Sequence, residues 1–216
     1  MTATHPGAPE GVAQDVEAPV AEQAVVGPLT GDPAIVGVPT FVVGSVMLGL
    51  ALINYAPAAG GTLPIIILAT GIGQLVATLW AAALGQSAVA AIFGIFSGFW
   101  LSYAALLTGL AHGWWGVTPA AVVHTVAAFL ISWLIIIGVL TVGSLRLPSA
   151  FTLIFALIDV ALILVLASTV NGSPSLAKAG GIVVFAFAAV GAYVFAGSLS
   201  VATGGKPFPL GRPVIS

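Results

Sequence analysis

Six long apolar stretches fill the chain from about residue 35 to residue 202, and only Arg146, Asp159 and Lys178 are charged within that region. Water cannot solvate such a surface, so a lipid bilayer is the solvent that suits it. A helix needs about 20 mostly apolar residues to cross the hydrocarbon core, and each stretch comes close to that length. The sequence therefore predicts an all-α integral membrane protein, with six transmembrane helices in one bundle.

Short breaks separate the predicted spans, and most of them are rich in Gly, Pro, Asn or Ser. The predicted spans cover about residues 35–54, 65–84, 88–111, 119–143, 150–170 and 177–202. Residues 1–30 should form a disordered N-terminal tail, because Pro, Gly, Ala and acidic residues dominate them and cannot bury enough apolar surface. The transmembrane domain then covers residues 31–204, and residues 205–216 form a C-terminal tail.

The positions of the basic residues predict the orientation of the chain. An even number of spans puts both termini on one side, together with Arg146, Lys206 and Arg212, whereas Lys178 lies near the other side. Basic residues collect in cytoplasmic loops. We therefore expect a multi-pass protein of the cell membrane with both termini, including the C-terminal tail, in the cytoplasm.

Composition argues against several classes of function. The net charge of −2 provides no basic field for nucleic acid, and the absence of cysteine excludes disulfides and thiolate metal sites. A metal site usually needs three or four ligands, and nothing near His124, the one histidine within a predicted span, supplies them. No Ser or Thr has a paired base. We expect no enzyme, no metal site and no cofactor.

Two polar residues inside predicted spans are candidates for function. Asp159 is the one acidic residue in a span, and a charge near the bilayer centre costs about 2.5–3.5 kcal/mol. It either accepts protons or lines a pore, or else it makes a buried hydrogen bond between helices, with His124, Ser132 or Ser168 as partners. Gln74 either lines a polar path or joins helices. If the solute is an anion, Asp159 must be neutral or point away from its path.

Several stretches, in order, resemble motifs of the acetate uptake transporter family, also called succinate–acetate permeases. They are residues 32–41 (DPAIVGVPTF), 71–74 (GIGQ), 93–101 (FGIFSGFWL), Trp133 with 143–146 (GSLR), and 208–211 (FPLG). The chain also departs from the family pattern. Asp32 replaces an Asn, Phe96 stands where a Tyr is usual, and Gly85-Gln86 replaces an acidic residue after the second span.

The resemblance implies a homo-hexamer with a conduction path through each six-helix protomer. It also implies an aromatic and aliphatic constriction at mid-membrane, formed by Phe41, Phe96 and Ile158. Asp159 neighbours Ile158 and replaces a residue that is usually neutral and polar. An apolar ring flanked by hydroxyls and amides passes small solutes and blocks an ion that carries its hydration shell. A small weak acid whose carboxylate is neutralised by a proton therefore suits it.

The sequence thus predicts a membrane channel or transporter for acetate or a similar short monocarboxylate, and it leaves open whether a proton is coupled. A channel for a small neutral polar solute, such as urea or a short amide, is the alternative. A third interpretation is a membrane subunit that transports nothing and packs against a partner, because fold alone does not fix function.

Overall fold

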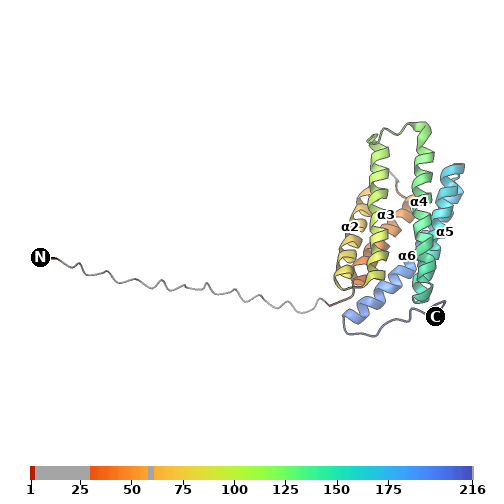
Figure 1. The fold of residues 1–216 in the computed structure, drawn as a ribbon. Coiled ribbons are helices and arrows are strands. Elements are labelled where there is room, and N and C mark those ends of the chain that lie inside the picture. Colours follow the sequence, from red (N-terminus) through yellow and green to blue (C-terminus); the bar gives the residue numbers. More distant parts are fainter. Residues whose placement is uncertain (3–29, 58–60, 216) are drawn as a thin grey trace.

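The computed structural model describes residues 1–2, 30–57 and 61–215, so the predicted disordered tail lies almost entirely outside the described residues. Within this part of the chain, six helices are long and apolar enough to cross a membrane. They are α1 Ala34–Leu52, α2 Thr62–Ala83, α3 Ser87–His112, α4 Val122–Gly143, α5 Ser149–Asn171 and α6 Pro174–Ala202 (Figure 1). Short 3-10 turns, Pro119–Ala121 and Ser144–Arg146, flank α4. The predicted fold class is confirmed.

Breaks in the sequence end the helices where they were expected. Gly113 and Gly172, with φ of 68° and 62°, terminate α3 and α5 in the left-handed conformation that glycine adopts without strain. The hydroxyl of Ser173 accepts from the backbone N–H of Leu176 at the start of α6, and Pro174 fills the first helical position. Each predicted span boundary lies within three residues of the observed one.

The helices form a ring in chain order. Each helix packs against the next, and α6 closes the ring by packing against α1. The exception is the pair α3 and α4, whose backbones scarcely touch. The chain enters α1 and finishes its C-terminal segment at the same end of the bundle, as an even number of spans requires (Figure 1). We call this the termini end; that it faces the cytoplasm stays a prediction.

Small residues allow the helices of the ring to approach closely. A Cβ atom added at Gly44 of α1 would lie 2.5 Å from the Thr70 hydroxyl oxygen of α2. One added at Gly71 of α2 would lie 2.6 Å from the Leu101 side chain of α3. In lipid, where no hydrophobic drive remains between helices, such backbone approach supplies the van der Waals contact that holds helices together.

The C-terminal segment, residues 205–215, folds back across the termini end of the bundle. The Tyr193 hydroxyl of α6 donates to the carbonyl of Pro209 over 3.0 Å. The backbone N–H of Ala150, at the start of α5, donates to the carbonyl of Leu210, also over 3.0 Å. This segment therefore links α6 to α5 and forms part of the bundle surface at this end.

Candidate functional site: two cavities separated by phenylalanines

Four phenylalanines from four helices meet at the centre of the ring. We call Phe41 of α1, Phe96 of α3, Phe155 of α5 and Phe187 of α6 the phenyl cluster; all four side chains are buried. Ring centroids are 5.4 Å apart for Phe41 and Phe96, 5.6 Å for Phe41 and Phe187, and 5.8 Å for Phe96 and Phe155. These separations fall in the range that aromatic pairs prefer, so the rings support one another in a fixed arrangement.

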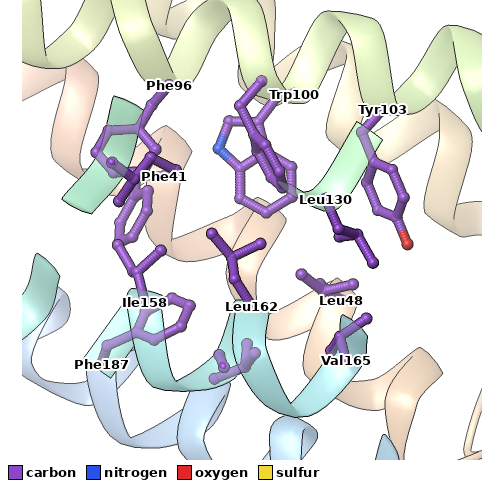
Figure 2. A pocket seen from close by; sticks show the side chains of 14 residues that line it. Phe41, Leu48, Phe96, Trp100, Tyr103, Leu130, Ile158, Leu162, Val165 and Phe187 are labelled. Atoms are coloured by element: carbon purple, nitrogen blue, oxygen red, sulfur yellow. The ribbon is translucent and has the colours of Figure 1, made fainter. Parts of the chain in front are cut away.

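Two cavities lie on opposite sides of Phe41 and Phe96, which line both. The near cavity lies toward the termini end, because Asp32, Leu147 and Leu210 belong to its wall. The far cavity lies toward the opposite end and includes residues further along α1, α3 and α5. Its wall consists of Phe41, Leu48, Phe96, Phe99, Trp100, Tyr103, Leu130, Ile137, Ile158, Ala161, Leu162, Val165, Val184 and Phe187 (Figure 2).

The two cavities differ in size and share an apolar character. The near cavity has a volume of about 260 Å³ and the far cavity about 40 Å³. Since one water needs about 10–15 Å³ by this measure, the far cavity holds roughly three or four waters. This number of waters is close to the number of heavy atoms in acetate. A solute moving between the cavities must pass Phe41 and Phe96.

The structure brings together the three residues that the resemblance assigned to a constriction. Phe41, Phe96 and Ile158 are all buried and line the far cavity, in the interior of the bundle rather than on its lipid-facing surface. Phe155 and Phe187 were not predicted. Phe155 lies three residues before Ile158, a spacing that puts two side chains on one helix face, so its position was open to inference. Phe187 of α6 reaches the cluster through tertiary packing alone.

Gln74 of α2 lies in the wall of the near cavity, in keeping with one of its two sequence interpretations. The side chain is fully buried, and neither its Oε1 nor its Nε2 atom has a hydrogen-bond partner among the described residues. A buried polar group without a partner costs about 1–3 kcal/mol. A solute that supplied both a donor and an acceptor would remove that cost, since the amide offers one of each type on the same edge.

Asp159 lies between α4 and α5 and lines neither of the two cavities. Its Oδ2 atom accepts a hydrogen bond of 2.7 Å from the Thr141 hydroxyl of α4, and within the described residues its Oδ1 atom is buried without a partner. The sequence suggested His124, Ser132 or Ser168 as partners, and the observed one differs. Antiparallel packing of the adjacent helices α4 and α5 brings Thr141 beside Asp159. A role for Asp159 in proton transfer stays a prediction.

The histidines lie apart from the cavities. His112 makes a hydrogen bond of 2.9 Å between its Nδ1 atom and the carbonyl of Thr108, and His124 is exposed near the start of α4. In the described part of the chain, no group of three or more His, Cys, Asp or Glu residues is arranged to hold a metal ion.

Comparison with known proteins agrees with this architecture. The meiotically up-regulated gene 86 protein of Schizosaccharomyces pombe is 30% identical over 121 residues, which are 51% of this chain and 38% of that protein. The chain thus matches well under half the length of this relative. The solved structure of the bacterial acetate channel SatP has the same fold, with a TM-score of 0.72 and 23% identity over 85% of this chain and 100% of that one. Residues 18–205 match the GPR1/FUN34/yaaH family. This match confirms the family resemblance drawn from the motifs, and the chain belongs to the GPR1/FUN34/yaaH family.

Proposed function

We propose that the protein is a membrane channel or transporter for acetate or a similar short monocarboxylate, with the phenyl cluster as its constriction. The observation that carries the proposal is the pair of central cavities separated by Phe41 and Phe96. Membership of the family and the shared fold with a bacterial acetate channel support it. The six helices that line these cavities are each long and apolar enough to cross a membrane, which also supports the proposal.

The chemistry of the path favours the protonated acid over the anion. Apolar rings cannot replace the water around a carboxylate, whereas a neutral carboxyl group crosses at a much lower cost. The Gln74 amide matches that neutral form, because its Nε2–H can donate to the carboxyl C=O while its Oε1 accepts from the carboxyl O–H. A carboxylate would take only the first of these bonds. We therefore propose that conduction is linked to a proton carried by the acid itself.

Uptake of labelled acetate into proteoliposomes tests the proposal. We expect uptake to rise at acidic external pH and to fall about three- to tenfold in the Gln74→Leu variant, the loss expected for one or two neutral hydrogen bonds. Gln86→Leu is the matched control, because Gln86 lies in the turn before α3 and lines neither cavity. Absence of acetate uptake by the folded protein at every pH would reject the proposal.

A channel for a neutral amide is the second candidate, and Gln74 is the observation that favours it. Urea and short primary amides also offer a donor and an acceptor on one edge, so they too can pair with the Gln74 side chain through two hydrogen bonds. Swelling of proteoliposomes in urea, acetamide and acetate separates the two candidates. Acetate flux well above urea flux supports the first, and equal flux favours the second.

The hexamer implied by the family resemblance belongs to the same proposal. The lipid-facing side of the ring carries many exposed apolar residues, including Ile65, Leu68 and Ile72 of α2, and such surfaces are available either to lipid or to neighbouring protomers. Native mass spectrometry of the detergent-solubilised protein measures the number of subunits. A mass corresponding to a single chain at all detergent concentrations would contradict a hexamer.

A further inference from the structure

The C-terminal segment, residues 205–215, buries a single side chain. Leu210 is half-buried, lines the near cavity and packs against the core, whereas every other residue of the segment is exposed. Pro207, Pro209 and Pro213 keep the segment out of a helix, because the residue before each proline is pushed toward extended backbone. Figure 1 shows the segment running from the end of α6 across the termini end of the bundle.

Hydrogen bonds from the start of α5 hold the backbone of Leu210. Its carbonyl accepts from the backbone N–H of Ala150 over 3.0 Å and from the Ser149 hydroxyl over 3.4 Å. Within the described residues, no side chain caps the start of α5, so the C-terminal segment supplies an acceptor that this helix would otherwise take from water. Gly211 follows with φ of 81°, and a Cβ atom there would collide with the Ser149 hydroxyl. The glycine thus allows the segment to lie directly against α5.

The contacts on either side of Leu210 lie where water can replace them. The Tyr193 hydroxyl donates to the carbonyl of Pro209 over 3.0 Å, and the Tyr193 ring centroid lies 5.4 Å from that of Phe208. The backbone N–H of Val214 donates to the carbonyl of Leu145 over 2.9 Å. Tyr193, Phe208 and Val214 are all exposed. Because a segment with few buried contacts opens locally at low cost, this one can leave the bundle while the helices stay folded.

Leu210 completes the wall of the near cavity at the termini end. Asp32, Ala88 and Leu147 also belong to the wall there, and each of them lies within two residues of the start of a transmembrane helix. Leu210 is the only residue of this wall that follows the last helix. Its departure would therefore open the near cavity, of about 260 Å³, without displacing a span.

We propose that the C-terminal segment is a lid, which closes the near cavity at the termini end while Leu210 is seated and opens it when the segment lifts away. The identity of the solute that this lid admits rests on the proposed function. Lids are drawn from the least stable parts of a fold, and their opening sets the rate in many proteins. Flux then depends on the fraction of molecules in which Leu210 is unseated.

A disulfide between α6 and the C-terminal segment tests whether the lid must move. The chain has no cysteine, so an introduced pair is the sole target of oxidant and reductant. A Cβ atom added at Gly197 would lie 3.1 Å from the Cβ atom of Phe208, a few tenths of an ångström below the usual disulfide range of about 3.5–4.5 Å. Oxidation of the Gly197→Cys/Phe208→Cys double variant should abolish acetate flux into proteoliposomes, and reductant should restore it. The two single-cysteine variants are the controls and should not respond. Equal flux in the oxidised and reduced double variant would overturn the lid.

Hydrogen–deuterium exchange follows the lid without any solute. Gly211→Ala places a side chain against Ser149 and strains the backbone, so it should unseat the segment and speed exchange in the peptide that contains Ala150. Gly85→Ala is the matched control, because Gly85 has a similar φ of 70° and an added Cβ atom there would have no neighbour within 4 Å. Acetate flux should rise in Gly211→Ala and not in the control.

The two measurements separate the lid from the proposed function. Faster exchange in Gly211→Ala with unchanged acetate flux rejects the lid and keeps the channel, since the segment would then be a support that the solute does not pass. Faster exchange in a protein that conducts no acetate keeps the movement of the segment and rejects the proposed function. Unchanged exchange in Gly211→Ala would show that Leu210 stays seated and would overturn the lid.

Discussion

Replacing Phe41 by Ala should widen the path, so that it admits solutes larger than acetate. Phe41 contacts Phe96 and Phe187 in the cluster and lines both cavities. Removing its phenyl ring therefore joins the near cavity of about 260 Å³ to the far cavity of about 40 Å³. Because Phe96 keeps its stacking contact with Phe155, we expect the opening to remain as a hole rather than collapse.

The size of the effect follows from the steric barrier and from the lost packing. If the ring imposes even about 1.4 kcal/mol on a solute wider than acetate, its removal raises the flux of that solute about tenfold. Loss of a buried phenyl group also destabilises a protein by about 3–5 kcal/mol. We thus expect a less stable protein in which the flux ratio of butyrate to acetate, and of benzoate to acetate, increases about tenfold or more.

Stopped-flow swelling of proteoliposomes in each acid gives these ratios, normalised to the amount of folded protein. Phe185→Ala is the matched control, because Phe185 is half-buried on α6 and lines neither cavity. It should lower stability without changing the ratios. The reasoning is refuted if Phe41→Ala remains folded and its butyrate-to-acetate ratio equals that of the wild type.

Two further predictions concern packing. Gly37→Ala would force a Cβ atom into the Phe93 ring, so it should destabilise the protein by about 1–3 kcal/mol, whereas Gly138→Ala, with no atom within 4 Å, should be neutral or stabilising. Equal thermal unfolding midpoints for the two variants in detergent would contradict this account. Thr141→Val leaves Asp159 without its hydrogen bond and should cost about 1–3 kcal/mol, yet acetate flux per folded protein should persist, because Asp159 lines neither cavity. A flux loss without a stability loss would place Asp159 in the path.

Hydropathy was sufficient to predict the spans, but it could not identify the residues that line the path. A membrane helix is apolar both where it meets lipid and where it meets the core, so periodicity does not separate the two faces. Of the chain's eleven phenylalanines, Phe41 and Phe96 were identified through the family resemblance. Phe187 was identified neither by hydropathy nor by the resemblance. Trp100 is one of several aromatic residues in its span, and the sequence analysis assigned it no individual role. Only the folded ring shows that this side chain borders a cavity and that its nitrogen has no hydrogen-bond partner in the part of the chain that the structure describes.

The pairing of Thr141 with Asp159 was beyond sequence reasoning for a related reason. The residues are eighteen positions apart on adjacent helices, and the register between two helices depends on how their small and large residues interlock. The possible roles of Gln74 were easier to predict from the sequence, because a lone amide in an apolar span has few roles. That neither polar atom of the Gln74 amide has a hydrogen-bond partner among the described residues depends on how the neighbouring helices pack, which the sequence does not reveal.

The loose contact between α3 and α4 has a mechanical consequence. Aromatic side chains bridge these helices: Phe99 and Tyr103 of α3 meet Phe129 and Trp133 of α4, with centroids 5.7–6.0 Å apart. Within the described residues, no side-chain hydrogen bond joins α3 to α4. A rotation of these rings can therefore change the spacing of the two helices without breaking a hydrogen bond between them. Because the backbones of α3 and α4 scarcely touch, we expect this pair to yield to lateral pressure from the bilayer more readily than the other neighbouring pairs of the ring. Because Phe99 and Tyr103 also border the far cavity, we expect membrane thickness and tension to change the width of that cavity.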